Sequence, residues 1–297
     1  MTNSLRTLGL AFCAAASLLP AAARAQVPAR VDWRVEAPRA DRPTRDGQVQ
    51  LELSYSLPGH TSSDSHTAAL SDLVGLAAGD LEAPDTRSVR FRLHRDAGDF
   101  ACEGQARLGQ ASGACTFAQN PAFAPALKTR GVAAPDETQA FNLALADIGL
   151  SYVDELGRQA YAKPTPDDLV RAGQHGAGLA YLKTMGGLGY RMGQVSDLIR
   201  ARDHGVTAAY VEGLASAGYV RVPVEDLLRA RDHGVSPAYL QGLAEAGYRG
   251  LPLEEVVRMR DHGVTSAFIR RVSTANGAEG GRLAPDQLIR LRDRGER

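Results

Sequence analysis

Residues 200–219 read RARDHGVTAAYVEGLASAGY, and residues 229–248 read RARDHGVSPAYLQGLAEAGY. The second stretch begins 29 residues after the first, because 229 minus 200 is 29. The same step connects a column of aromatic residues in the C-terminal half: Phe123, Tyr152, Tyr181, Tyr210, Tyr239 and Phe268. A constant step of this size is typical of a repeat array, in which each unit packs on its neighbours.

Capping residues at the same step indicate that each unit holds two helices. One column contains residue types that begin helices well: Asn120, Gly149, Gly178, Thr207, Ser236 and Thr265. Another column contains residue types that end helices: Gly131, Gly189, Gly218, Gly247 and Asn276. In one unit these signals predict a helix from Thr207 to Ala217 and a second from Val224 to His233. Residues 119–297 are therefore expected to form an α-solenoid of two-helix repeats with a 29-residue period.

Alternation of polar and apolar residues replaces the helical period in the N-terminal half. Residues 48–55 read QVQLELSY and residues 88–94 read SVRFRLH. This pattern is typical of strands with one buried face. Trp33 and Val35 are expected in a first strand, whereas residues 38–47 and 58–65 are expected to be polar loops. We therefore expect a small antiparallel β domain in residues 26–118, and an α+β fold for the chain.

The first 25 residues have the features of a secretory signal peptide. Arg6 precedes an apolar stretch at residues 8–19, and Ala23-Arg24-Ala25 matches the small-residue pattern at which such peptides are cleaved. A membrane anchor is the alternative, but the apolar stretch is short for a bilayer span. We expect cleavage of residues 1–25, no membrane span afterwards, and a periplasmic or secreted location.

Cleavage would leave two cysteines, Cys102 and Cys115. An even pair in an oxidising compartment favours a disulfide. The residues between them are rich in turn formers, and Phe100 and Phe117 flank the pair, so we expect the disulfide to join two strands of a hairpin. A thiol metal pair is the alternative, but the spacing differs from a C-x-x-C clamp and no histidine is adjacent.

The charge balance gives no indication of nucleic-acid binding. The 34 basic residues less Arg6 and Arg24 leave 32, against 34 acidic residues, so the mature chain is nearly neutral. The sequence contains no H-E-x-x-H, G-x-S-x-G, P-loop or dinucleotide-binding motif. We therefore expect a non-catalytic protein without a cofactor or metal.

A repeated Arg-Asp-His-Gly motif is the conspicuous polar feature of the array. Its basic residues are candidates for weak, multi-site binding of an acidic partner: Arg202, His204, Arg231, His233, Arg260 and His262. The alternative is helix termination, because a histidine in the last turn complements the helix dipole and glycine follows it. The arginines and aspartates are also candidates for salt bridges between neighbouring units.

Two further features leave alternatives open. The tyrosine columns form either a concave binding platform for carbohydrate or peptide, or the packing between units, and helical spacing beside leucines favours packing. Residues 60–66 read HTSSDSH. They are interpreted as a surface loop with incidental histidines, since a zinc site needs more ligands at fixed geometry.

The units that read L-x-R-A-R-D-H-G-V-[ST]-x-x-Y-[VL]-x-G-L-A-x-A-G-Y resemble repeats carried outside the membrane by bacterial sensor-antirepressor proteins of the BlaR1/M56 peptidase type. Residues 91–98, FRLHRDAG, and the hairpin after them are similar to the segment that precedes such repeats. The resemblance covers most of residues 88–297. This sequence lacks the membrane helices and the H-E-x-x-H motif of that family, so the resemblance implies a free-standing extracytoplasmic module without protease activity.

Three functional hypotheses follow from the sequence. The first is an exported interaction protein whose helical repeats bind a protein partner in the cell envelope. The second is a sensor that binds a small molecule or an envelope glycan in the β domain or at the domain junction. The third, less favoured, is a hydrolase with an unrecognised motif.

Overall fold

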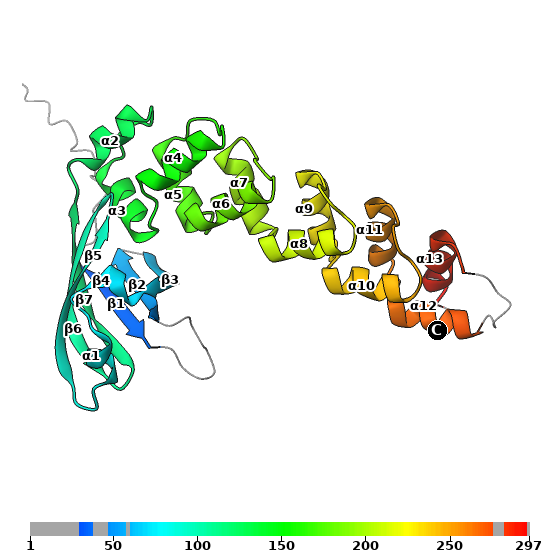
Figure 1. Ribbon diagram of the computed structural model, residues 1–297, viewed down its shortest axis with the longest axis horizontal. Coiled ribbons are helices and arrows are strands. Elements are labelled where there is room, and N and C mark those ends of the chain that lie inside the picture. Colours follow the sequence, from blue (N-terminus) through cyan, green and yellow to red (C-terminus); the bar gives the residue numbers. More distant parts are fainter. Residues whose placement is uncertain (1–29, 38–46, 58–59, 276–281, 296–297) are drawn as a thin grey trace, which may run out of the picture.

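The computed structural model describes residues 30–37, 47–57, 60–275 and 282–295. The predicted signal peptide, residues 1–25, lies outside the described residues. The fold is α+β: a curled antiparallel sheet precedes a long run of helices that extends away from it (Figure 1). The predicted order of a β region followed by helical repeats is therefore confirmed.

The sheet has seven strands in the order β3-β2-β1-β7-β6-β5-β4. The strands are β1 (Val31–Glu36), β2 (Gln48–Leu57), β3 (His60–Ala69), β4 (Leu73–Val74), β5 (Arg87–Arg95), β6 (Gly98–Arg107) and β7 (Gln110–Gln119). A short 3-10 helix at Leu70–Asp72 and helix α1 (Ala78–Glu82) interrupt them. All pairings are antiparallel.

The prediction of a polar loop at residues 58–65 is wrong from His60 onward, because β3 begins there. Its register pairs Leu51 with His66 and Leu53 with Asp64. This strand lies at the edge of the sheet, and residues 63–67 are polar on both faces, so they show no alternation of apolar and polar residues. Backbone pairing with β2 stabilises it instead.

The sheet curls around Trp33. Its indole ring meets the Phe91 ring edge-on at 4.8 Å, although β1 and β5 are not neighbours in the sheet. The indole nitrogen donates to the carbonyl oxygen of Glu103 at 3.2 Å. Gly104 and Gly113 face each other across β6 and β7, and a Cβ atom on Gly104 would stand 2.7 Å from the Trp33 ring. Gly104 therefore gives the indole the space it needs.

The predicted disulfide is present. Cys102 and Cys115 are direct partners in the register of β6 and β7, and their sulfurs are bonded. The two strands continue past the cysteines and turn at Leu108 and Gly109, both with positive φ. The cysteines therefore join a hairpin, as expected.

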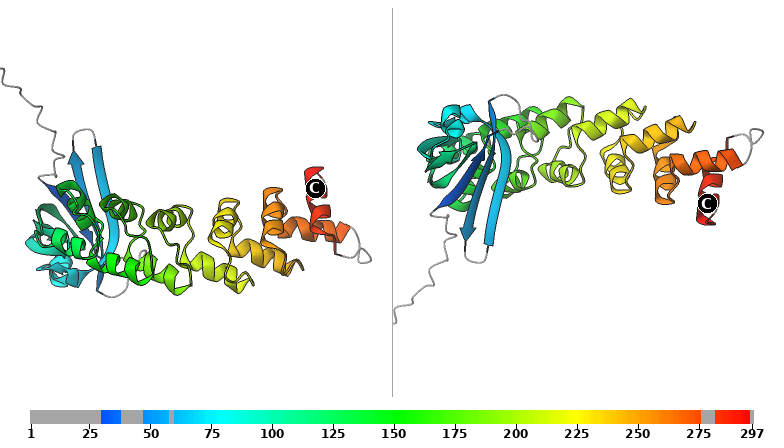
Figure 2. Two further views of the ribbon diagram at one scale, coloured as in Figure 1. Left: turned by 90° about the horizontal axis from the view of Figure 1, so that it is seen from above. Right: turned by 90° about the horizontal axis from the view of Figure 1, so that it is seen from below.

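The helices of the array form two rows, visible in the views of Figure 2. They are α2 (Phe123–Thr129), α3 (Glu137–Leu145), α4 (Leu150–Arg158), α5 (Pro166–Gln174), α6 (Leu179–Gly187), α7 (Val195–Asp203), α8 (Ala208–Ser216), α9 (Val224–Asp232), α10 (Pro237–Glu245), α11 (Leu253–Asp261), α12 (Ser266–Ala275) and α13 (Pro285–Asp293). Helix α4 contacts α6, and α8, α10 and α12 contact one another in turn, while α3, α5 and α7 stack together and α9, α11 and α13 stack together. The contacts of α6 with α8 and of α7 with α9 are sparser, and the apolar core divides into two clusters there. Stacking of like helices is the arrangement of a solenoid.

Most predicted caps are found where the repeat places them. The hydroxyls of Thr207 and Ser236 accept hydrogen bonds from the amides of Tyr210 and Tyr239. Gly218 and Gly247 follow their helices with φ of 95° and 90°. Asn120 does not cap a helix as predicted. Its side-chain oxygen accepts a hydrogen bond from the Ala122 amide in a turn, and α2 begins at Phe123. Asn276 lies outside the described residues.

One aromatic side chain from the array closes the open end of the curled sheet. Phe141 of α3 meets the rings of Tyr55, Phe100 and Phe117 at 5.1, 6.2 and 5.3 Å. A polar contact accompanies it: the Asp96 carboxylate accepts from the Leu150 amide at 2.7 Å, at the start of α4. As a result the apolar core runs without interruption from the sheet to α7.

Replacing Cys102 and Cys115 together by alanine is expected to destabilise the fold by about 3 kcal/mol, the value of the chain-entropy model for a loop of this size. Urea unfolding of the double variant and of the parent, each with and without reductant, measures it. The parent should lose stability on reduction, and the variant should not respond to reductant. Equal stability of the oxidised parent and the variant would contradict the prediction.

Ala160 takes the slot that Gly131, Gly189, Gly218 and Gly247 fill in other units, and its φ is 60°. A side chain in this left-handed conformation costs about 1 kcal/mol. Ala160→Gly is therefore expected to stabilise the protein by up to about 1 kcal/mol, less the entropy that glycine adds to the unfolded chain. Gly218→Ala is the matched control and should destabilise. Thermal unfolding of both variants measures the difference.

Candidate functional site

The first tyrosine column joins each unit to the next. The hydroxyls of Tyr181, Tyr210 and Tyr239 donate to backbone carbonyls one unit further along: Val206 at 2.7 Å, Val235 at 3.1 Å and Val264 at 2.8 Å. Their rings are buried or half-buried between helices. Of the two interpretations left open by the sequence, packing between units applies to this column.

The motif arginines lie on these tyrosines. The guanidinium carbons of Arg202, Arg231 and Arg260 stand 5.4, 5.3 and 5.1 Å from the ring centres of Tyr181, Tyr210 and Tyr239. Such cation–π contacts are favourable at this distance. Arg260 also donates to the carbonyl oxygen of Gly234 at 3.0 Å. These arginines are therefore engaged within the array.

The motif histidines and aspartates form a second ladder. In each pair the Nδ1 atom of a histidine lies within hydrogen-bond distance of an aspartate in the following unit: His175–Asp203 at 2.9 Å, His204–Asp232 at 2.6 Å, His233–Asp261 at 2.7 Å and His262–Asp293 at 2.8 Å. Salt bridges between units were considered from the sequence with arginine as the cation. In the structure the aspartates instead pair with the histidines.

We name the row of short loops that carries these contacts the short-loop edge: residues 202–206, 231–235 and 260–264. The six basic residues predicted to bind a partner all lie on it, and each is exposed yet held by the next or the preceding unit. No group of three or more histidine, cysteine or acidic residues able to hold a metal occurs in the part of the chain that the structure describes.

The second tyrosine column connects the longer loops that follow the second helix of each unit. The hydroxyl of Tyr161 accepts from the Met192 amide at 3.1 Å, and those of Tyr219 and Tyr248 donate to the carbonyls of Leu251 and Leu283 at 2.8 and 2.6 Å. Successive long loops are thereby held side by side. We name them the long-loop edge: residues 160–165, 189–194, 218–223, 247–252 and 282–284.

Each long loop carries an exposed basic residue, and none carries an acidic residue among those described: Lys163, Arg191, Arg221, Arg249 and Arg282. None of these side chains forms an ion pair with another described residue; three of them bond to backbone carbonyls. Sequence reasoning missed this set, although basic residues recur one or two positions after the tyrosines of the second column. Arg282 also lies over the Tyr248 ring, with its guanidinium carbon 5.0 Å from the ring centre.

A groove of about 500 Å³ opens beside this edge, between α8 and α10. Tyr219, Tyr248 and Arg249 line one end, and small residues such as Gly213 and Ala217 line the floor. A Cβ atom at Gly213 would stand 2.4 Å from the Pro237 ring, so glycine is needed where the two helices approach. A groove of this volume is within the range of ligand-binding sites.

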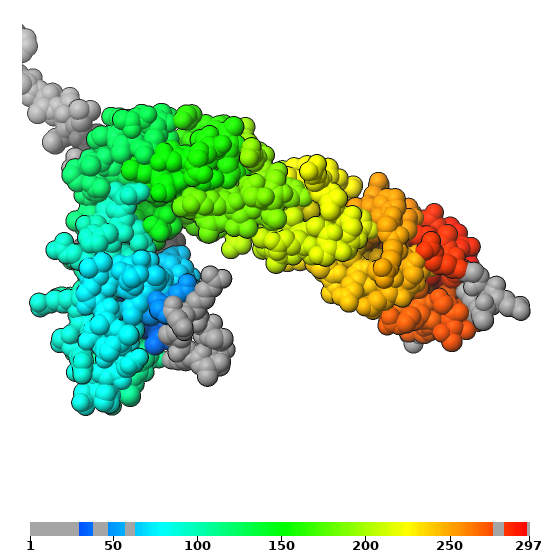
Figure 3. Space-filling view, in the orientation of Figure 1, coloured from blue at the N-terminus to red at the C-terminus, as the bar shows by residue number. Residues whose placement is uncertain are grey.

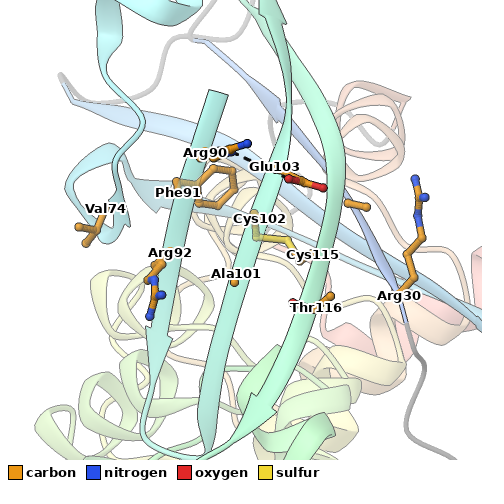
Figure 4. Close-up of a pocket in the computed structure, with 11 residues that line it drawn as sticks. Arg30, Val74, Arg90, Phe91, Arg92, Ala101, Cys102, Glu103, Cys115 and Thr116 are labelled. Carbon is orange, nitrogen blue, oxygen red and sulfur yellow. Dashed lines mark ion pairs between the residues drawn. A yellow bond between two sulfur atoms is a disulfide. The ribbon is translucent and has the colours of Figure 1, made fainter. Parts of the chain in front are cut away.

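The exposed face of the sheet has a second depression, of about 710 Å³ (Figure 4). Its floor consists of Ala101, Thr116 and neighbouring small residues, with Arg90 and Arg92 along one side and Arg30 along the other. The ion pair of Arg90 with Glu103 is long, with Nε and Oε2 4.0 Å apart. The depression is open, and its lining residues all belong to the sheet or directly precede it.

The predicted surface loop at residues 60–66 belongs to β3. Within it, the His66 ring nitrogen Nδ1 lies 2.7 Å from a carboxylate oxygen of Asp64.

Burial raises the pKa of Tyr181, Tyr210 and Tyr239 to about 12. Because these phenols ionise nearer pH 10 in the unfolded chain, the folded state binds more protons between pH 10 and 12. The stability that the neutral tyrosines contribute is therefore complete below pH 10 and is lost as the pH rises toward 12. Circular dichroism and phenolate absorbance against pH should show the helices melting together with tyrosine ionisation. Phenolate formation with intact helices would contradict this.

No known protein family, no curated protein and no solved structure matches this chain. Among the described residues, no helix is both long enough and apolar enough to cross a membrane.

Proposed function

We propose that this chain is an exported, non-catalytic interaction protein whose helical repeats bind a protein partner in the cell envelope, in the periplasm or outside the cell. The contrast between the two edges of the array carries the proposal. On the short-loop edge, each histidine pairs with an aspartate of the next unit, and each motif arginine lies on a tyrosine ring of the preceding unit. On the long-loop edge, exposed cations without ionic partners flank an open groove.

The compartment rests on the disulfide and on the N-terminal sequence. A bonded pair such as Cys102–Cys115 persists in oxidising compartments. The proposal is also consistent with the resemblance to the extracytoplasmic repeats of BlaR1/M56-type sensor proteins. Solenoid repeats commonly use their extended surfaces for protein recognition. The contrast between the two edges moves the proposed binding surface from the short-loop edge, which carries Arg202, His204 and their equivalents, to the long-loop edge.

Glycan or small-molecule sensing is the second candidate. The depression on the sheet supports it, since arginines and a threonine hydroxyl surround an accessible floor. A thermal-shift screen of the full chain with envelope glycans and anionic small molecules addresses it.

The test of the proposed function is capture followed by mapping. The chain is crosslinked in the envelope fraction of its source organism, captured partners are identified, and each is purified and bound again to the full chain. Hydrogen exchange of the complex is expected to show new protection in α6 to α12. Absence of any partner that rebinds, or protection confined to β5, β6 and β7, would contradict it.

A further inference from the structure

The long-loop edge presents cations at regular intervals. Lys163, Arg191, Arg221, Arg249 and Arg282 come from successive loops that tyrosine hydroxyls hold side by side. Stacked helices lie about 10 Å apart, so neighbouring charges on the edge are separated by roughly that distance. Val220, next to Arg221 in the same loop, is an apolar side chain with 67% of its surface exposed.

The nearest acidic residues do not neutralise these cations. Several lie in the first turns of the helices that follow the loops and are bound to arginines of the same helix or of the neighbouring first helix. Glu225 pairs with Arg200, Asp226 pairs with Arg229 at 3.0 Å, and Asp286 pairs with Arg258 at 2.7 Å. Glu245, at the end of α10, is the exposed acidic residue closest along the chain to Arg249, and its carboxylate accepts a hydrogen bond from Gln241 at 3.0 Å.

The first units of the array show what fits the groove between neighbouring second helices. Gln159, the residue after α4, is buried between α4 and α6, and its amide nitrogen donates to the Leu182 carbonyl at 3.2 Å. Glu155 fills the same groove one turn earlier and bonds to Gln159 at 2.7 Å. At the repeat step, Gly213 and Ala217 take these slots in α8. The Pro237 ring occupies the Gly213 slot, whereas at the Ala217 slot the small side chain leaves the α8–α10 groove open.

We propose that the long-loop edge binds an extended acidic segment of the partner protein, with one glutamine-like side chain of that segment inserted in the α8–α10 groove. The proposal rests on the proposed function and names the class of partner. Extended peptide advances by about 3.3 Å per residue, so three residues match the roughly 10 Å between successive cations. The favoured segment therefore has a carboxylate at every third position.

The probe is a fluorescein-labelled synthetic peptide of fifteen residues with glutamate at every third position and glutamine and serine between. Its binding to the full chain is followed by fluorescence anisotropy at low and high salt. One control peptide has the same composition with the glutamates grouped at one end. The other has lysine in place of each glutamate. We expect the periodic peptide to bind most tightly, the lysine peptide not to bind, and salt to weaken binding.

Two variants test the edge and the groove separately. Arg221→Glu with Arg249→Glu should weaken binding about tenfold, because two exposed attractions become repulsions. The matched control, Arg90→Glu with Arg92→Glu on the sheet, should leave binding unchanged. Ala217→Gln places a glutamine in the slot of Gln159 and should fill the groove, which weakens binding about fivefold through lost burial of a side chain. Thermal unfolding establishes that each variant remains folded.

Several outcomes would overturn the inference. One is binding that survives both the double reversal and Ala217→Gln, and another is equal affinity for the periodic and grouped peptides. Binding of inorganic polyphosphate or of vesicles with anionic lipid, without binding of the peptide, would identify a different class of ligand. If a partner captured from the envelope still binds both variants, the proposed function stands and this inference fails. If no partner rebinds at all, the proposed function itself fails.

Discussion

Each junction of the array from α6 onward depends on one aromatic side chain that must reach into the next unit. The hydroxyls of Tyr181, Tyr210 and Tyr239 satisfy backbone carbonyls at the same relative position each time. A buried carbonyl without a partner is costly, so this contact fixes the distance and rotation between units. The arginine on the ring and the histidine–aspartate pair beside it then fall into place at every step. The other edge of each unit is held by fewer side chains, which leaves its charges available.

Much of this arrangement could be predicted because its signals are local and repeated. A threonine or serine before a helix and a glycine after it act within one turn of backbone, so the caps at Thr207 and Gly218 could be read directly. Repetition at a fixed step then supplied independent copies of each signal. The hairpin of Cys102 and Cys115 was accessible for a similar reason, since two cysteines among turn formers have few other uses in an oxidising compartment.

Contacts between distant segments could not be predicted in this way. The strand at His60–Ala69 exists because β2 offers it backbone partners, and nothing in its own polar sequence indicates that. Phe141 closes the sheet through three aromatic rings from three strands, which no spacing along the chain reveals. The long-loop cations were missed from the sequence for a related reason. The most regular motif, Arg-Asp-His-Gly, is regular because every junction needs it, whereas the long-loop cations vary in their position within the loop.

The regular motif and the proposed binding surface therefore lie on different edges of this molecule. A residue that each unit needs for contact with its neighbour cannot change without loss of stability, so strict repetition marks the structural edge. A residue that contacts only solvent or a partner is free to differ between units. The floor of the groove shows this difference most clearly. The slot that Gln159 fills near the sheet holds Ala217 in the middle of the array, so the same repeat is closed at one place and open at another. A groove at the site of a small side chain, beside cations without ion pairs, is a feature that packing alone does not require.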